Sequence, residues 1–135
     1  LPIYAECGGL MYLMEVLIDF KKRKFPMVGV FKGLVKMADK RKALGYVYAQ
    51  TLTDNVLSKK GAKVRGHIFH WSYLECRPGK YPFVYRVKKD KDRIFYDGLA
   101  KNKVLASYVH LHFASCLDFA KNFIHSCQEF KVING

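Results

Sequence analysis

A cysteine stands at the junction between an extended segment and a helical one. The β-prone residues 2–6 lead into Cys7, and two glycines follow it before an apolar pattern of helical spacing begins. Ala5 and Gly9, two positions before and after the cysteine, leave room for the close backbone approach of a nucleophile elbow. The N-terminus of a helix favours thiolate over thiol, so we expect Cys7 to be a nucleophile with a lowered pKa. The alternative is a buried cysteine that ends a core strand, but the small flanking residues and the helix favour the nucleophile.

A histidine at the end of an apolar segment is the partner expected for this thiol. Residues 104–110 form a strongly apolar stretch that ends at His110, and α/β sheets place their chemistry at the carboxyl ends of strands. An imidazole there can hold the proton of Cys7 and deliver it to a leaving group. His112, two residues further on, would point to the same side if the strand continued.

The histidines also raise the question of a metal site, because four of them occur as the pairs His67/His70 and His110/His112. Zinc would require cysteine or carboxylate partners at matching spacing. The sequence offers none that is convincing, so no metal is expected. The fifth histidine, His125, falls in the expected terminal helix and should be structural or exposed.

Periodicity predicts the elements that must position the thiol and the imidazole. A helix should begin after Cys7, with an apolar face at three- and four-residue spacing formed by Leu10, Leu13, Met14, Leu17 and Ile18. The basic run 21–24 suits its C-terminal end, and we expect this helix to pack on a sheet. β-formers predict strands at 25–31, 34–38, 44–52, 64–74, 82–88 and 104–110.

The segments between these strands are predicted to be loops and turns. Residues 53–62 form a polar loop, and Pro78-Gly79 and Asp97-Gly98 are turn signals. A second helix over 116–129 should carry an apolar face of Cys116, Phe119, Ala120, Phe123, Ile124 and Cys127. A helix near each end with strands between them predicts an α/β fold with a mixed sheet flanked by helices.

Length and composition fit one modest domain, with 135 residues of which 50% are hydrophobic. No apolar stretch reaches transmembrane length. The four cysteines contain no CxxC pair, so we expect free thiols in a reducing compartment, the cytoplasm. The chain begins without methionine and inside an expected strand, so we expect an N-terminally truncated piece of a longer protein.

The net charge of +13 suggests a comparison with nucleic-acid-binding proteins. The cations are scattered over the segments 21–24, 36–42, 59–65, 86–93 and 101–103. No zinc-finger or RNA-binding signature accompanies them, so nucleic acid is not favoured. A solvated basic surface, or one balanced by an acidic part of the parent chain, is favoured, and a polyanion-binding surface stays open as the alternative.

Three segments, in this order, match a known family: residues 4–13 (YAECGGLMYL), 65–72 (RGHIFHWS) and 105–113 (LASYVHLHF). They resemble the glutaminase domain of cobyrinic acid a,c-diamide synthases, a cobalamin-biosynthesis branch of the type 1 glutamine amidotransferases. Residues 36–46 are also similar to that family, so the resemblance covers essentially the whole chain. It implies a flavodoxin-like, three-layer α/β fold.

The resemblance implies a role for each matching residue. Cys7 would attack the side-chain amide of glutamine and form a glutamyl thioester, and His110 would be the catalytic base and acid. The backbone N–H of Gly8 would be one oxyanion-hole donor. Three more residues would lie near the glutamine or beside the base as substrate-binding residues, namely Met11, Ser107 and Tyr108.

The resemblance also implies a second catalytic unit. Ammonia would pass to a synthetase domain of the same parent protein, which uses ATP and Mg to activate tetrapyrrole carboxylates and convert them to amides. Residues 1–135 would be the C-terminal part of the glutaminase domain, without the upstream oxyanion loop and the synthetase domain. The tetrapyrrole would be a corrinoid or nickel-sirohydrochlorin. A basic polyanion-binding module derived from a glutaminase is the alternative function.

Two positions depart from the family pattern. The wider amidotransferase class usually has glutamate two residues after the catalytic histidine, where this chain has His112, and the resembling branch also lacks that glutamate. The family usually has glutamate where Ile68 stands, and we expect this change to alter a local polar contact.

Overall fold

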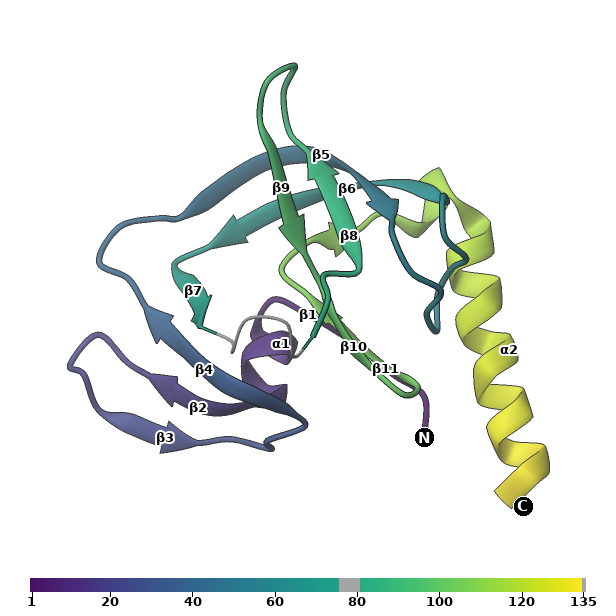
Figure 1. Cartoon of the computed structure of the whole chain (residues 1–135), viewed down its shortest axis with the longest axis horizontal. Helices are drawn as coiled ribbons and strands as arrows, with labels where there is room; N and C mark the ends of the chain where they lie inside the picture. Colours follow the sequence, from purple (N-terminus) through teal and green to yellow (C-terminus); the bar gives the residue numbers. More distant parts are fainter. Residues whose placement is uncertain (76–80, 135) are drawn as a thin grey trace.

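The computed structural model describes residues 1–75 and 81–134. Its strands form three sheets, with a short helix beside them and a long helix near the C-terminus (Figure 1). The predicted mixed α/β class is confirmed, with the strands distributed over several sheets. The turn predicted at Pro78-Gly79 lies outside the described residues.

The smallest sheet carries the candidate nucleophile at the end of one strand. Its strands, in spatial order, are β1 (Ile3–Glu6), β11 (Val104–Ser107) and β10 (Leu99–Lys101). β1 and β11 are parallel and Glu6 lies opposite Ser107, so both strands end at the same level. The chain leaves β1 at Cys7 and enters α1 (Gly8–Leu13).

A five-stranded antiparallel sheet carries the candidate base. Its strands, in spatial order, are β12 (His110–Leu111), β6 (Lys63–His70), β5 (Ala43–Thr51), β8 (Tyr85–Lys88) and β9 (Ile94–Asp97). Alternate residues of β6 are exposed and buried, so one face of the sheet meets solvent and the other meets the core. The inner face packs against Leu105, Val109 and Phe119.

The third sheet has four strands and covers the other side of α1. They are, in spatial order, β3 (Lys24–Pro26), β2 (Met14–Ile18), β4 (Phe31–Met37) and β7 (Ser72–Glu75). Leu10 and Leu13 of α1 pack with Met14 and Phe31 in a second core cluster that also includes Leu99 and Ala106. The helix therefore joins this sheet to the three-stranded one.

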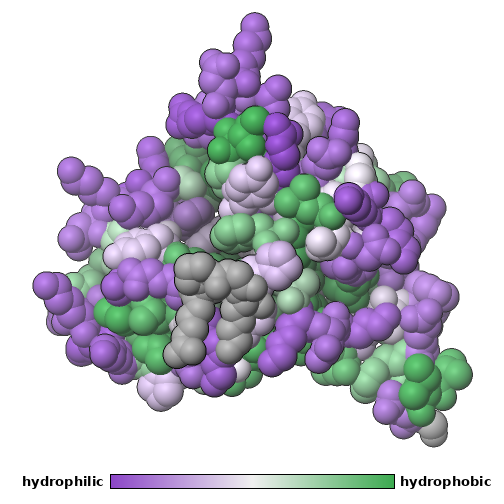
Figure 2. Space-filling model, viewed as in Figure 1, coloured by the Kyte–Doolittle hydropathy of each residue, from purple (hydrophilic) through white to green (hydrophobic). Residues whose placement is uncertain are grey.

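The C-terminal helix has two buried residues, Phe119 in its first turn and Ser126 in its third. A 3-10 turn, η1 (Phe113–Ser115), leads into α2 (Leu117–Asn134), where Phe119 is buried in the main core. Burying a phenylalanine stabilises the fold by about 1.5–3 kcal/mol. Farther along α2, Ile124 and Cys127 are exposed, so the apolar face predicted to include them is wrong in that half. Figure 2 shows apolar surface at the far end of α2, where Val132 and Ile133 are exposed.

The helix predicted after Cys7 is shorter than its apolar spacing indicates. It ends at Leu13, and residues 14–18 continue as β2, paired with β3 and parallel to β4. Residues 21–23 of the basic run form the turn before β3, where an Asp19 carboxylate oxygen accepts the backbone N–H groups of Lys21 and Arg23. Pairing with two strands outweighs the local helical pattern, because the same apolar residues also suit a strand.

Two segments predicted as single strands change sheets midway. The stretch 64–74 divides at Trp71 into β6 and β7, and the stretch 104–110 divides at residues 108–109 into β11 and β12. The two breaks lie side by side, because the hydroxyls of Ser72 and Tyr108 are 2.8 Å apart and hydrogen-bonded. Consequently His110 belongs to the five-stranded sheet and not to the end of β11.

Candidate active site

The backbone turns sharply at Cys7. This residue has φ 48° and ψ −102°, a conformation that costs free energy for any residue other than glycine. Its N–H donates to the Ser107 carbonyl at 2.8 Å, and its carbonyl accepts the Met11 N–H at 3.1 Å. A Cβ built on Gly9 would lie 3.0 Å from the Ala5 Cβ, so the small residues predicted for an elbow are required by the geometry.

The electrostatic surroundings of the Cys7 thiol differ from the prediction. Partial burial raises the pKa of this thiol, with a smaller opposing effect from the Gly8 N–H and further raising effects from the Glu6 and Asp97 carboxylates. The expected lowering of the pKa is therefore wrong, since α1 has only six residues and burial outweighs the helix end. The neutral thiol donates to the Phe69 carbonyl oxygen at 3.7 Å.

The His110 imidazole is held between a second histidine and a carboxylate. Its ring stacks on His67, the residue opposite it on β6, with centroids 4.6 Å apart and planes 12° from parallel. Its Nδ1 lies 3.5 Å from Oε2 of Glu6. Glu6 was not among the predicted site residues, and it immediately precedes Cys7 in the chain.

The thiol and the imidazole are both linked to β6, where the three-stranded and five-stranded sheets come together. Cys7 leaves the end of β1, and its sulfur contacts the β6 carbonyl of Phe69. His67, two residues before Phe69, stacks on His110. Glu6, on β1, reaches the same ring. Cys7 and His110 therefore share neighbours on β1 and β6, through Glu6 and through the segment from His67 to Phe69.

A buried carboxylate supports the segment that leads to His110. Asp97 accepts the backbone N–H groups of Tyr108 at 3.2 Å and Val109 at 2.8 Å. Burial raises the pKa of Asp97, and these N–H bonds oppose that rise. From the sequence, Asp97-Gly98 indicated only a turn, and it gave no sign that the carboxylate supports another segment. The turn is present, with Gly98 at φ 82°.

The three predicted substrate-binding residues lie close to this junction, two of them as buried parts of it. Ser107 is fully buried and its hydroxyl donates to the Val109 carbonyl at 3.0 Å. Tyr108 is buried, and its ring stacks on His70 with centroids 4.0 Å apart. Met11 is partly exposed, and its sulfur accepts the Ser72 hydroxyl at 3.4 Å.

The remaining histidines lie in different surroundings. His70 is half-buried, its Nδ1 is 2.8 Å from the Ser72 carbonyl, and burial lowers its pKa. The backbone of His112 bonds to Arg65 and caps η1, and the residue is exposed. His125 is exposed on α2, 3.2 Å from Glu129. In the described part of the chain, no three histidine, cysteine or acidic side chains converge as a metal site would require.

Ile68, where the resemblance led us to expect glutamate, faces the core. It is 3% exposed and packs with the apolar side chains on the inner face of the five-stranded sheet. An apolar residue is therefore suited to this position in the present chain.

In residues 1–75 and 81–134, none of the helices has the length and apolar character needed to cross a membrane.

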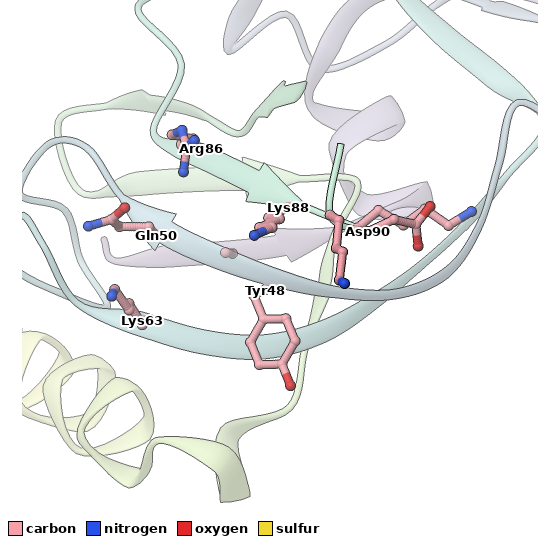
Figure 3. A pocket seen from close by; sticks show the side chains of 9 residues that line it. Tyr48, Gln50, Lys63, Arg86, Lys88 and Asp90 are labelled. Atoms are coloured by element: carbon pink, nitrogen blue, oxygen red, sulfur yellow. The ribbon is translucent and has the colours of Figure 1, made fainter. Parts of the chain in front are cut away.

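A basic hollow opens on the outer face of the five-stranded sheet, over β5, β6 and β8. Its volume is about 600 Å³, and five of its lining residues are cations, namely Lys63, Arg86, Lys88, Lys89 and Lys91. Figure 3 shows their strands side by side, with Gln50 between Lys63 and Arg86 as the strand register requires. Among the described residues, no ion pair joins these cations to a carboxylate, and Asp90, at the rim, pairs with Arg93.

Comparison with known proteins identifies the family. Residues 1–116 match the family model described as a CobB/CobQ-like glutamine amidotransferase domain. A cobyrinate a,c-diamide synthase of Dehalococcoides mccartyi (strain CBDB1) is 45% identical over 136 positions, covering 98% of this chain and 29% of that protein. The Methanothermobacter thermautotrophicus protein of the same name is 43% identical, covering 96% of this chain and 28% of that protein. The chain therefore spans less than a third of these relatives, and it belongs to the CobB/CobQ-like glutamine amidotransferase domains.

Proposed function

We propose that this chain is the glutaminase part of an ATP-dependent cobyrinate a,c-diamide synthase. The observation that carries the proposal is the sharp turn at Cys7, with φ 48°, which presents the thiol at the junction that also holds His110. Such a turn exposes a nucleophile that a strand or helix interior would cover. The family match and the names of the relatives support the reaction class.

In the proposed reaction, the Cys7 sulfur attacks the side-chain amide carbon of glutamine while His110 takes the thiol proton. The new C–S bond places negative charge on the amide oxygen, to which the Gly8 N–H donates. The C–N bond then breaks, and His110 returns the proton to the leaving nitrogen as ammonia departs. Water attacks the thioester with His110 again as base, which releases glutamate and restores the thiol.

The raised pKa of the Cys7 thiol supports a base acting during the attack. A thiol that is neutral at rest must lose its proton as the C–S bond forms, so the imidazole has to lie within reach. We accordingly expect the Cys7 sulfur and a His110 nitrogen to approach hydrogen-bond distance when glutamine binds. Met11 would line the glutamine site, while Ser107 and Tyr108 would flank the base.

The released ammonia would serve a synthetase domain of the same parent protein. That domain would use ATP and Mg to activate the carboxylates of cobyrinate, and residues 1–135 would be the C-terminal part of the glutaminase domain. The support is the length of the relatives, which are more than three times as long as the segment they share with this chain. Nickel-sirohydrochlorin is the substrate to assay beside cobyrinate.

The test is amidation by the parent protein with two nitrogen sources. Cys7→Ala should abolish the amidation of cobyrinate with glutamine, and amidation with an ammonium salt should continue, because the synthetase chemistry does not need the thiol. Cys127→Ala, at an exposed position on α2, is the matched control and should leave both activities unchanged. Glutamine-dependent amidation that survives Cys7→Ala would overturn the proposal.

The basic hollow supports a second candidate, the binding of a polyanion. Its five cations have no ion-pair partner within the described ranges, so an anion there would meet uncompensated charge. With tripolyphosphate as the probe, Arg86→Gln with Lys88→Gln should weaken binding at least about tenfold, or 1.4 kcal/mol. Lys121→Gln with Lys131→Gln, on α2, removes the same charge elsewhere. Equal losses in both pairs would mean general attraction to a basic protein and would reject a site.

A further inference from the structure

Glu6 occupies a position that connects the nucleophile with the base. It is the last residue of β1, directly before Cys7, and its side chain is 28% exposed. Because the chain turns sharply at Cys7, the side chains of Glu6 and Cys7 have different partners. The Cys7 thiol contacts the Phe69 carbonyl, and the Glu6 carboxylate accepts a backbone N–H from β12. Glu6 therefore joins the three-stranded sheet to the strand that carries His110.

One carboxylate oxygen of Glu6 is held by two donors. Oε1 accepts the backbone N–H of Leu111 at 2.7 Å and the hydroxyl of Tyr4. Burial and the neighbouring carboxylate raise the pKa of Tyr4, so its hydroxyl remains a neutral donor. Two charge-assisted hydrogen bonds from separate elements fix the plane of the carboxylate. Oε2 is left facing the imidazole.

The other oxygen, Oε2, faces Nδ1 of the His110 ring at 3.5 Å. This separation is longer than a strong hydrogen bond, as catalytic contacts often are before substrate binds. The ring has little freedom to turn away, because His67 stacks against its face. A carboxylate beside Nδ1 favours the tautomer that carries its proton there, which leaves the lone pair on Nε2.

We propose that Glu6 is the positioning residue for His110: its carboxylate holds the imidazole with the proton on Nδ1 and stabilises the imidazolium formed when Nε2 takes the Cys7 proton. This inference rests on the proposed glutaminase function. It assigns the orienting carboxylate to the residue before the nucleophile, whereas the residue two positions after the base, His112, is exposed. The other titratable groups near the ring are His67 and His70, both from β6.

The test is glutamine hydrolysis by the parent protein as a function of pH. Glu6→Gln keeps an oxygen for the Leu111 N–H and the Tyr4 hydroxyl but removes the charge beside Nδ1. We expect kcat to fall about 10²–10⁴-fold with KM little changed, as when a carboxylate behind a catalytic histidine is neutralised. The acid limb of kcat/KM should move to lower pH, because the imidazolium loses its counter-charge. Glu6→Asp should retain part of the activity and the wild-type position of the limb.

The chain offers a matched control, since Glu129 also faces a histidine, His125, at 3.2 Å on α2. Glu129→Gln should leave kcat, KM and the pH profile unchanged. If Cys7→Ala retains glutamine hydrolysis, the proposed function fails. If Cys7→Ala is inactive while Glu6→Gln keeps wild-type kcat and the same acid limb, only the role of Glu6 is overturned.

A second measurement holds even if Glu6→Gln does not fold. The ¹⁵N shifts of the His110 ring in histidine-labelled Cys7→Ala protein report which nitrogen carries the proton. We expect the Nδ1–H form while Glu6 is present. An Nε2–H tautomer for His110 in that protein would overturn the proposal, whatever the activity of any variant.

Discussion

Two regions of the five-stranded sheet differ in how their polar groups are held. One is the histidine edge, formed by His110 of β12 and His67 of β6, and the other is the basic hollow. At the β12 edge, His110 stacks on His67 and faces Glu6, whose other oxygen accepts two donors. In the basic hollow, five cations project without an ion-pair partner in the described part of the chain, and Figure 2 shows hydrophilic side chains over the projecting hairpin between β8 and β9. A cluster of unpaired cations therefore indicates a solvated surface, whereas hydrogen bonds and ring contacts between polar side chains indicate where those side chains are already oriented for chemistry.

The largest contrast in stability should come from two aspartates, one in each region. Asp97→Ala removes the acceptor for the buried Tyr108 and Val109 N–H groups, and each unsatisfied group costs about 1–3 kcal/mol. We expect the free energy of unfolding to fall by about 2–6 kcal/mol in urea denaturation. Asp90→Ala, which breaks only the exposed pair with Arg93, should change it by less than about 1 kcal/mol. Equal losses would remove the contrast between the regions.

A smaller effect is expected when the elbow is crowded. Gly9→Ala places a Cβ 3.0 Å from the Ala5 Cβ, and overpacking of this kind costs about 1–3 kcal/mol. The double variant with Ala5→Gly should recover most of the loss, because it removes the opposing atom. Gly8→Ala has open space around the new Cβ and should not destabilise the fold in the same thermal or urea unfolding experiment. Failure of the double variant to recover would show that the Gly9 backbone, and not the contact, is responsible.

The reactivity of Cys7 should separate a simple thiol reagent from a glutamine mimic. Its raised pKa means that a smaller fraction of the thiol is thiolate at a given pH, so the rate of iodoacetamide labelling of Cys7 should still be increasing at pH values where an ordinary thiol has reached its plateau. A chloroketone analogue of glutamine should label Cys7 ahead of Cys76, Cys116 and Cys127 near pH 7.5, because His110 assists the attack. Mass spectrometry of the modified peptides gives both results. Preferential chloroketone labelling of exposed Cys127 would contradict the second.

The smallest effect should come from the basic hollow. Lys63→Gln with Lys88→Gln removes two exposed cations that have no ion-pair partner among the described residues, and surface changes of this kind stay within about 0.5 kcal/mol. We expect the sign to be stabilising at low salt, since like charges are relieved, and the difference to shrink as salt is added. A loss above about 1 kcal/mol would mean that these lysines are held by partners, as the histidine edge is.

The elbow could be predicted from sequence because its requirements are local. Two small residues flank Cys7 at fixed positions, and their close approach depends on the turn alone. The strand at 43–51 was predicted almost to its ends for a similar reason, since its β-forming residues are a local signal. The residues at 14–18 were mistaken for helix because apolar side chains at this spacing suit either element, and the pairing with β3 and β4 decided between them.

The support around His110 could not be read from the chain because its contacts are remote. Glu6 meets Leu111 over a separation of 105 residues, and Asp97 meets Val109 through backbone groups that have no sequence signature. The change of sheet at residues 108–109 likewise occurs within an unbroken apolar run. These long-range contacts add Glu6 and His67 to the predicted pair, and no spacing in the sequence indicated either of them.

The break between β11 and β12 has a mechanical consequence for the elbow. Cys7 follows a strand of the three-stranded sheet, and His110 lies on a strand of the five-stranded sheet. The distance between the sulfur and the imidazole therefore depends on how the two sheets are placed relative to each other, and not on one rigid strand. A small slide of either sheet would put the pair out of alignment without unfolding anything. The hydrogen bond from the Leu111 N–H to Glu6 connects the two sheets and restrains that movement.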